Sequence, residues 1–412
     1  MTFVLTVDPD RWHANVDAAL AARDDPATGG TVVPVAKSNG YGLGQALVAH
    51  QMRARRRPVL SVGTVYEALD AHLEWDADLL VLTPWNVAEA QADAAWKQAR
   101  QRYGTMLITT IADAASLRAA ARESMAHPGR PVRVLVEGLT SVSRFGFSEQ
   151  GLTAALADPE VAAALGSGAL RLAGLALHLP MVEPQIARTA AGRHLASDSA
   201  AEPVIAGSGK TRQTVSWALW WLAAVSRCSA AAGSGADFSC APHLWVSHLS
   251  PGELGEVRAA LPDVPVHPRI GTALWLGDPG SLQARGVVLA VHPAKPGGAG
   301  YFQHRVPNGG HLVVVGGGTN HGVAMSGPIG AATMKRRATT AGNGLLEAVG
   351  RVLSPFRWQG KRLWFLEAPH ASVSLVVVPK GVRPPVVGDE LPCQLRLTTA
   401  HFDQVIGLSE PR

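Results

Sequence analysis

Lys37 is the residue whose position most directly suggests chemistry. It follows the apolar run of residues 32–36 and precedes a glycine-rich stretch, residues 38–44. Loss of hydration in an apolar setting disfavours the ammonium ion and lowers the pKa of a lysine, which makes its amine a nucleophile able to form Schiff bases. The small residues that follow let a ligand approach the backbone closely. The same pattern also fits a strand that ends at a surface lysine before an ordinary turn.

Polar residues follow several later apolar runs in the same manner. Glu137, His178, Ser247, His248 and Arg269 each stand at the end of such a run. In a barrel of parallel strands, the carboxyl ends of the strands carry the functional residues. Several polar residues in this position are hard to explain as core residues, so together they predict a site there.

The elements that must hold these residues alternate between β-branched runs and alanine-rich helical stretches. After an opening strand near residues 4–8 and a helix from Pro9, the predicted strands are 32–36, 59–62, 79–82, 106–110, 132–136, 172–177, 244–246 and 264–267. The predicted helices include 65–73, 87–100, 112–124, 152–165 and 251–260. Eight strands separated by helices predict a (β/α)8 barrel of the α/β class, with a doubly wound open sheet as the alternative.

The pattern changes near residue 280. Apolar runs at 287–291, 312–315, 363–366 and 373–378 are separated by Gly, Pro and Asn, without long helices between them. This pattern is typical of β-strands and predicts a second, mostly-β domain. We therefore expect a barrel domain over residues 1–278 and a C-terminal domain over residues 279–412.

Residues 182–243 interrupt the barrel pattern and form a divergent segment. They contain Gly207-Ser208-Gly209-Lys210-Thr211, which looks like part of a phosphate-binding loop but has Val204 where the first glycine is required. We expect no nucleotide site there. A predicted helix near residues 214–227 carries Trp217, Trp220 and Trp221, a spacing that favours core or subunit-interface packing.

Composition narrows the functional classes. The 412 residues are 47% hydrophobic and 17% charged, with a formal net charge of +5, which is typical of a globular chain and gives no indication of nucleic-acid binding. The three cysteines are widely spaced and predict neither a disulfide framework nor a metal site. No signal peptide and no membrane span is expected, and a cytoplasmic location is the simplest one.

The segment around Lys37 resembles the lysine motif of the alanine racemase family, V-K-A-N-A-Y-G-H-G. Here the residues 36–44 are Ala-Lys-Ser-Asn-Gly-Tyr-Gly-Leu-Gly. The resemblance implies that the cofactor is pyridoxal 5'-phosphate, that Lys37 forms the internal aldimine with it, and that Tyr41 reaches the cofactor phosphate.

Other strand-end segments resemble motifs of the same family. Residues 144–147, Arg-Phe-Gly-Phe, resemble its G-R-L-G-F, which implies that Arg144 helps to hold the substrate carboxylate. The segment that ends at His178 resembles G-L-M-T-H-F, which implies that this ring packs against the cofactor. The segment from Arg269 resembles R-P-G-I-A-L-Y-G, so that Arg269 would meet the pyridine nitrogen. The same resemblance implies phosphate contacts from Ser247, Gly271 and Thr272.

The resemblance fails at one catalytic position. The family has a tyrosine in G-Y-A-D-G, which its second domain lends to the partner subunit, whereas residues 318–322 here are Gly-Thr-Asn-His-Gly, with Thr319 at that place. A two-base racemase needs a proton donor and acceptor on each face of the α-carbon. Threonine is a poor base, so we expect His321 to replace the tyrosine, and His370 is a second candidate. The alternative is that both are ordinary loop histidines. A homodimer with shared sites is also implied.

These resemblances predict a pyridoxal-phosphate-dependent racemase of a small, alanine-like amino acid. Arg269 cannot hand a proton to the cofactor ring, which favours α-proton chemistry over decarboxylation. The alternatives are another reaction of the same cofactor, such as a lyase, decarboxylase or one-sided epimerase, and a cofactor-binding protein without catalysis. The resemblance also implies a place in amino-acid metabolism, including that of the cell wall.

Overall fold

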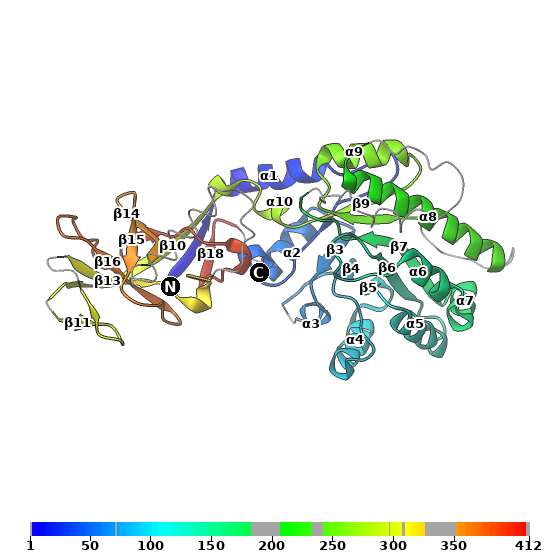
Figure 1. The fold of residues 1–412 in the computed structure, drawn as a ribbon, viewed down its shortest axis with the longest axis horizontal. Coiled ribbons are helices and arrows are strands. Elements are labelled where there is room, and N and C mark those ends of the chain that lie inside the picture. Colours follow the sequence, from blue (N-terminus) through cyan, green and yellow to red (C-terminus); the bar gives the residue numbers. More distant parts are fainter. Residues whose placement is uncertain are drawn as a thin grey trace, which may run out of the picture. The chain divides into compact units, whose positions relative to one another are not determined.

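Eight parallel strands follow one another around a nearly closed barrel in the computed structural model (Figure 1). They are β2 (Val33–Pro34), β3 (Val59–Val62), β4 (Asp78–Val81), β5 (Leu107–Ile111), β6 (Val132–Gly138), β7 (Leu170–Leu177), β8 (Leu244–Ser247) and β9 (Val266–Ile270). Their spatial order is β2-β9-β8-β7-β6-β5-β4-β3. A parallel bridge between Val35 and Ser61 joins β2 to β3. The predicted (β/α)8 barrel is confirmed, and the open sheet was the wrong alternative.

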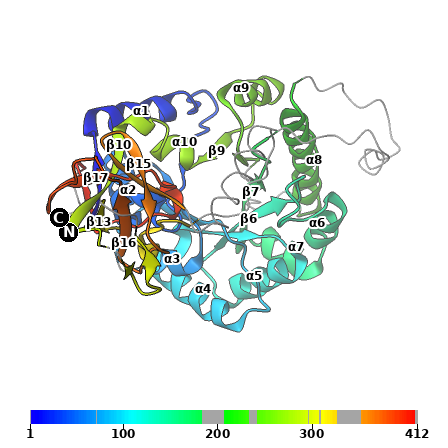
Figure 2. The ribbon, with the colours of Figure 1, turned by 60° about the vertical axis from the view of Figure 1, so that its left-hand side comes forward.

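Helices cover the outside of the strands, as Figure 2 shows for α4 to α9. The helices are α1 (Pro9–Ala21), α2 (Gln45–Ala54), α3 (Val65–Ala68), α4 (Ala90–Tyr103), α5 (Ala114–Ala126), α6 (Glu149–Leu156), α7 (Pro159–Gly166), α8 (Gly209–Ala232), α9 (Pro251–Ala260) and α10 (Thr272–Trp275). The single helix predicted over 152–165 is two helices. Pro159 starts the second one, and the carboxylate of Asp158 accepts from the Glu160 and Val161 amides as its cap.

The barrel is filled by side chains from neighbouring strands. The buried cluster is Val33, Val59, Leu80, Ile108, Leu135, Ala173, Ala176 and Trp245. The largest of these, Trp245, donates from its indole nitrogen to the carbonyl of Ala173 at 3.0 Å, so its polar atom is satisfied inside the core. Trp217 and Trp221 on α8 are buried as well, in agreement with their predicted packing role.

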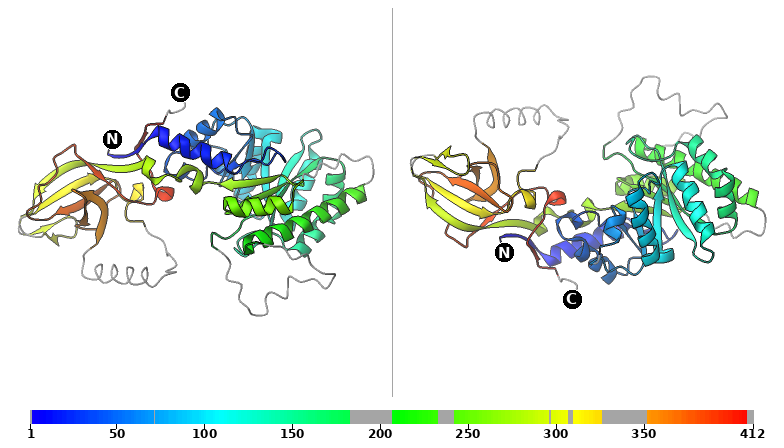
Figure 3. Two further views of the ribbon diagram at one scale, coloured as in Figure 1. Left: turned by 90° about the horizontal axis from the view of Figure 1, so that it is seen from above. Right: turned by 90° about the horizontal axis from the view of Figure 1, so that it is seen from below.

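The second unit is built on a mostly antiparallel sheet. Its strands are β1 (Phe3–Val7), β10 (Leu282–Pro293), β13 (His311–Gly316), β14 (Leu353–Trp358), β15 (Lys361–Phe365), β16 (Val373–Val378), β17 (Glu390–Pro392) and β18 (Gln404–Ile406), while β11 (Gly298–Ala299) and β12 (His304–Arg305) form a small hairpin. β1 pairs with β10 in antiparallel and with β18 in parallel orientation. Figure 3 shows β1, in blue, beside β10. The predicted C-terminal β domain is confirmed.

The structure describes residues 2–70, 72–182, 207–232, 242–295, 297–306, 310–325 and 352–408. One compact unit contains Val16–Ser38 and Val48–Leu274, and the other contains Met1–Asn15, Asn39–Leu47 and Trp275–Arg412. The predicted border at residues 278–279 lies close to the last of these breaks. Much of the divergent segment 182–243 lies outside the described residues. No helix in the described parts of the chain is long and apolar enough to cross a membrane.

Candidate functional site

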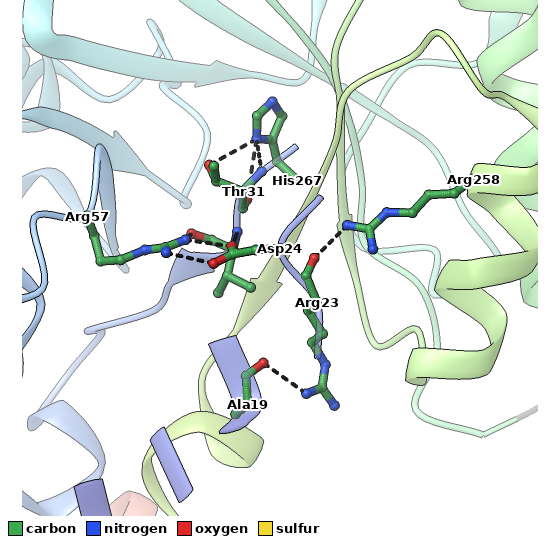
Figure 4. Close-up of polar contacts among 8 residues, drawn as sticks. Ala19, Arg23, Asp24, Thr31, Arg57, Arg258 and His267 are labelled. Atoms are coloured by element: carbon green, nitrogen blue, oxygen red, sulfur yellow. Dashed lines mark hydrogen bonds and ion pairs between the residues drawn. The ribbon is translucent and has the colours of Figure 1, made fainter. Parts of the chain in front are cut away.

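A network at the amino end of β2 fixes the strand that leads to Lys37. Both guanidinium nitrogens at the tip of Arg57 donate to the Asp24 carboxylate at 2.8 Å, and the amide of Val32 donates to the same carboxylate at 2.7 Å (Figure 4). Arg57 also donates to the Val32 carbonyl at 3.0 Å. The loop before β2 is tied to β9 as well, because the Thr31 amide donates to Nδ1 of His267 at 3.2 Å. These contacts therefore fix β2 at its amino end, whereas Lys37 follows its carboxyl end.

Seven polar residues gather at or just beyond the carboxyl ends of the barrel strands, and we call them the strand-end cluster. They are Lys37, Glu137, Arg144, His178, Ser247, His248 and Arg269. All seven belong to the barrel unit. We expected from the sequence that the polar residues after apolar runs would lie close together, and in the structure they do.

Lys37 lies just beyond β2 with an exposed side chain beside β3. A Cβ added at Gly63 would stand 3.1 Å from the Cβ of Lys37 and 2.9 Å from Oε1 of Glu67, so the end of β3 needs glycine for this close approach. Partial burial lowers the pKa of the Lys37 ammonium, the positive charge of Arg144 lowers it further, and the Glu67 carboxylate opposes both. The surroundings therefore favour the neutral, nucleophilic amine.

Arg269 and Glu137 form an enclosed pair of opposite charges. Arg269 is 7% exposed and Glu137 is 2% exposed. Arg269 donates from its terminal nitrogen to the carbonyl of Leu177 at 3.1 Å, whereas its Nε and the Oε2 of Glu137 have no hydrogen-bond partner among the described residues. Burial raises the pKa of the Glu137 carboxyl against the pull of Arg269 and Arg144. A buried polar atom without a protein partner costs free energy unless water, an ion or a ligand satisfies it.

His178 is held in place by Ser247. Nδ1 of His178 lies 3.0 Å from the Ser247 hydroxyl oxygen, which also accepts from the Leu179 amide at 3.2 Å. Burial lowers the pKa of His178 to about 3, and Arg269 and Arg144 contribute to the shift. The ring is therefore neutral near pH 7. The ring of His248 packs edge-on against it, with centroids 5.1 Å apart.

A short loop after β6 presents Arg144. The loop is closed by hydrogen bonds from the Phe147 amide to the Glu137 carbonyl and from the Leu139 amide to the Phe147 carbonyl, both 2.8 Å. Gly146 has a φ of +124°, and a Cβ there would stand 2.6 Å from backbone atoms of Gly138 and Leu139. The side chain of Arg144 is exposed, so a cation is available to a carboxylate in solution.

Two further predicted cofactor contacts, Gly271 and Thr272, stand at the start of α10. Gly271 is partly exposed and Thr272 is exposed. The Gly271 carbonyl accepts from the Leu274 amide at 2.9 Å. Their predicted role toward a phosphate stays a prediction.

Lys210 is occupied by one carboxylate and one backbone carbonyl of the protein. Its ammonium donates to Oε2 of Glu253 and to the carbonyl of His248, each at 2.9 Å, and the Ser208 hydroxyl donates to Glu253 at 2.8 Å. Burial raises the pKa of Glu253, but bonds from the Ser250 amide and Lys210 outweigh this and lower it to about 2. The loop that looked like a phosphate loop thus braces α8 against α9, because Lys210 at the start of α8 pairs with Glu253 on α9.

The remaining candidates lie in the other unit. Tyr41 sits in a 3-10 turn, Gly40–Gly42, with a φ of +61°, and burial raises the pKa of its hydroxyl to about 12. His321 is 8% exposed; its Nδ1 accepts from the Gly318 amide and its Nε2 lies 3.2 Å from the Asp403 carboxylate. His370 bonds to Glu367 at 2.8 Å and stacks on Tyr301. Both nitrogens of His321 are used locally, so its catalytic role stays a prediction that this geometry does not favour.

One neighbour of Lys37 was absent from the predictions. Glu67 accepts from the Gly63 amide at 2.7 Å and lies on α3, where the Thr64 hydroxyl accepts from the Glu67 amide as the helix cap. The Thr-x-x-Glu spacing signals a helix start, and a helix directly after a barrel strand places its first turn at the strand ends. That signal could have found Glu67.

Known proteins resemble this chain in sequence pattern and in fold. A family model described as alanine racemase, N-terminal domain, matches residues 7–217. No curated protein matches the chain. Among solved structures, the chain is similar to an alanine racemase of Clostridium difficile 630, with 12% identity, a TM-score of 0.59, and coverage of 95% of this chain and 87% of that one.

Two more solved structures are similar. One is an alanine racemase of Bartonella henselae with covalently bound pyridoxal phosphate, at 16% identity and a TM-score of 0.56, covering 98% of this chain and 99% of that one. The other is a histidine racemase of Leuconostoc mesenteroides subsp. sake, at 15% identity and a TM-score of 0.59, covering 98% of both chains. At these identities the likeness shows a shared fold. Because the family model spans about half of the 412 residues, the chain belongs to the alanine racemase N-terminal domain family.

Proposed function

We propose that this chain is a pyridoxal-phosphate-dependent racemase of a small, alanine-like amino acid. The observation that carries the proposal is the strand-end cluster, in which the pKa of Lys37 is lowered and two arginines stand close to it. Membership of the family supports the reaction class. The choice of amino acid rests on the resemblance to alanine racemases.

The residues of the cluster fit the cofactor. Arg144 and Arg269 are cationic, while Glu137 is enclosed and His178 is neutral, so the cluster favours an anionic ligand. The unpartnered Nε of Arg269 and Oε2 of Glu137 are buried atoms that a bound polar group can satisfy. Lys37 would hold the cofactor covalently, and His178 and Arg269 would flank it.

Lys37, Arg144 and Arg269 would each have a different role in the reaction. Pyridoxal phosphate, when bound, supplies an electron sink that weakens the bond between the α-carbon of an amino acid and its hydrogen. The Lys37 amine, whose pKa is lowered by its surroundings, accepts or returns that proton on one face. Arg144 binds the carboxylate of the amino acid. Arg269 is a permanent cation and donates no proton, which favours reaction at the α-hydrogen over decarboxylation.

A second candidate is proton exchange at the α-carbon without inversion. The resemblance supports it, because it puts Thr319 at the place of the family's tyrosine. The geometry supports it too, because both ring nitrogens of His321 are engaged inside their own unit. An enzyme with Lys37 alone would work on one face. A cofactor-binding protein without turnover is the third possibility and predicts no exchange at all.

The proposal includes a homodimer with shared sites. In support, the C-terminal unit carries two neighbouring aromatic side chains that are largely exposed, Tyr301 at 79% and Phe302 at 75%. Exposed aromatic residues are enriched at protein interfaces.

The first test is the visible absorption spectrum of the protein loaded with pyridoxal phosphate, before and after borohydride. We expect a violet-region band that borohydride bleaches and that Lys37→Ala lacks. Lys97→Ala is the matched control, because Lys97 is an exposed residue of α4 paired with Asp93. A band that survives in Lys37→Ala would refute the assignment of this lysine.

The second test separates the three candidates by chemistry. L-alanine and other small amino acids are incubated with the loaded protein in heavy water, and both configuration and deuterium content are measured. Inversion with deuterium incorporation is the result expected for a racemase. Incorporation without inversion, or new products, indicates a one-sided enzyme or another reaction, and no change in either quantity indicates binding alone.

A further inference from the structure

His248 stands at the carboxyl end of β8 in an unusual backbone conformation. It directly follows Ser247, has a φ of +60°, and has an exposed side chain. Positive φ values are uncommon outside glycine, and where they occur they often mark a functional position. Its carbonyl is anchored by the Lys210 ammonium at 2.9 Å, so the backbone is fixed while the ring stays accessible.

The other candidate histidines are already committed to hydrogen bonds. Nδ1 of His178 is tied to Ser247 at 3.0 Å. His321 and His370 each have a carboxylate within 3.2 Å, from Asp403 and Glu367 respectively. Among the described residues, neither ring nitrogen of His248 has such a partner. Within the described ranges, its ring packs edge-on against that of His178, with centroids 5.1 Å apart.

Positive charges surround the His248 ring from several elements. Partial loss of hydration lowers the pKa of His248, and so do the positive charges of Arg269 on β9, Lys37 beyond β2, Lys210 on α8 and Arg144 in the loop after β6. His178 on β7 is neutral. The imidazole of His248 is consequently neutral near pH 7 and has a nitrogen able to accept a proton.

We infer that His248 is the second proton-transfer residue, contributed by the same barrel that carries Lys37 and standing in for the missing tyrosine. The inference rests on the proposed racemase function. In the reaction the α-C–H bond breaks with its electron pair left on the carbon, and the proton passes to the neutral nitrogen on one face. A protonated nitrogen on the other face then supplies the proton of the new C–H bond. Lys37 and His248 exchange these roles for the two enantiomers.

The first experiment compares His248→Gln with wild type, with each enantiomer of alanine incubated separately in heavy water. We expect racemisation to fall by roughly 100-fold or more, the usual contribution of a general acid or base. Exchange of the α-hydrogen should persist for the one enantiomer that Lys37 serves, with an unchanged cofactor absorption band. His127→Gln, at the exposed end of α5, is the matched control and should behave as wild type.

The second experiment needs no turnover. Diethyl pyrocarbonate acylates neutral imidazoles, and mass spectrometry locates the modified residues after short exposure at pH 6. We expect His248 to be modified faster than His178, His321 and His370, because its ring is exposed and has no hydrogen-bond partner among the described residues. Pyridoxal phosphate together with L-alanine should slow modification of His248 and leave that of His127 unchanged.

The outcomes separate this inference from the function on which it rests. Wild-type protein that exchanges no α-hydrogen would overturn the proposed function and the inference with it. Three results would overturn the inference and leave the proposed function standing. They are racemisation by His248→Gln within about threefold of wild type, equal loss of exchange from both enantiomers, and no protection of His248 from acylation. The asymmetric loss of exchange together with ligand protection would support it.

Discussion

Arg269 places a positive charge almost entirely inside the protein, and Glu137 is the acidic group that balances it. Removing one member of an enclosed pair leaves the other charge uncompensated, which costs about 3 kcal/mol or more. We therefore expect Glu137→Gln to lower the free energy of unfolding by about 3 kcal/mol and to weaken cofactor binding. Urea unfolding and titration with pyridoxal phosphate measure the two effects.

Glu89→Gln is the control for this change. Glu89 is exposed at the start of α4 without a side-chain capping bond, and surface substitutions of this kind change stability by about 0.5 kcal/mol or less. A Glu137→Gln protein as stable as this control would mean that the buried carboxyl is protonated and carries no charge.

Histidines with lowered pKa values make the stability of the barrel depend on pH. The pKa of His267 is lowered to about 4, chiefly by burial, and that of His178 to about 3. Between these values and the ordinary value of 6.5, the unfolded chain binds protons that the folded chain does not, so stability is full above pH 6.5 and falls as the pH decreases.

Unfolding in urea should therefore require less denaturant at pH 5 than at pH 7.5. The carboxylates with lowered pKa values, such as Glu253 at about 2, lose their contribution to stability only below about pH 4.5, outside the range from pH 7.5 to 5. His178→Asn should show a shallower dependence between pH 7 and 5, whereas His127→Gln should keep the wild-type slope. A flat stability curve from pH 7.5 to 5 in wild type would contradict the assignment of neutral buried imidazoles.

At the level of residues, the sequence predicted the site residues that follow apolar runs. It missed the site residue that a helix positions. Lys37, His178, Ser247 and Arg269 follow runs whose direction is evident, so their common location followed from the barrel alone. Glu67 reaches the cluster from the first turn of α3, and no apolar run ends on it. His248 was visible as a strand-end residue, but its freedom from hydrogen bonds depends on what its neighbours bind.

Among the elements, the loop after β6 depends on one glycine. Gly146 combines a φ of +124° with backbone atoms 2.6 Å from the place of a Cβ. Gly146→Ala should destabilise the protein by about 2 kcal/mol and displace Arg144, so that the KM for the amino acid rises more than kcat falls.

Gly129→Ala is the matched control for the loop. Gly129 also has a positive φ, +82°, but nothing lies within 4 Å of the place of its Cβ. It should therefore cost only the conformational penalty of about 1 kcal/mol and leave KM unchanged. Equal effects of the two substitutions would show that crowding in the Arg144 loop has no consequence.

The amino end of β2 is a second element with a specific support. Asp24→Asn removes the negative charge and leaves one acceptor oxygen in place of the two that bind Arg57 and the Val32 amide. Because hydrogen bonds to charged groups contribute about 1.5–3 kcal/mol, we expect stability to fall by roughly 2 kcal/mol. Asp76→Asn is the comparison, since its pair with Arg53 is exposed and should contribute under about 1 kcal/mol. Thermal unfolding of both variants distinguishes an anchored β2 from an ordinary surface pair.

Local sequence patterns predicted most helices and strands. They failed where a strand pairs with a strand far away in the sequence. The strands 59–62 and 373–378 and the helix 251–260 were predicted with their observed bounds, because apolar periodicity and caps are local signals. The split between α6 and α7 was missed although Pro159 marks it. The membership of β1 in the sheet of the C-terminal unit has no local signal, since Phe3 pairs with Gly286.

For the whole molecule, the proposed dimer predicts that the aromatic pair Tyr301 and Phe302 is covered by a second copy. The double substitution Tyr301→Ser and Phe302→Ser should shift the protein toward monomer in light scattering at micromolar concentration. Tyr66→Ser is the control, since Tyr66 is also exposed, at 52%, but lies on α3 of the barrel unit. Monomeric wild-type protein, or a double variant that stays dimeric, would contradict this part of the proposal.

The position of β1 has a consequence for how the chain is made. During synthesis β1 leaves the ribosome on the order of tens of seconds before β10 and β18, the strands that it pairs with, at 5–20 residues per second. Over that interval Phe3, Leu5 and Val7, which end up buried, are exposed on an unpaired edge. Chaperones that shield nascent apolar segments therefore have a defined target at the start of this chain. Nascent chains arrested before β10 should depend on such chaperones more than the finished protein does.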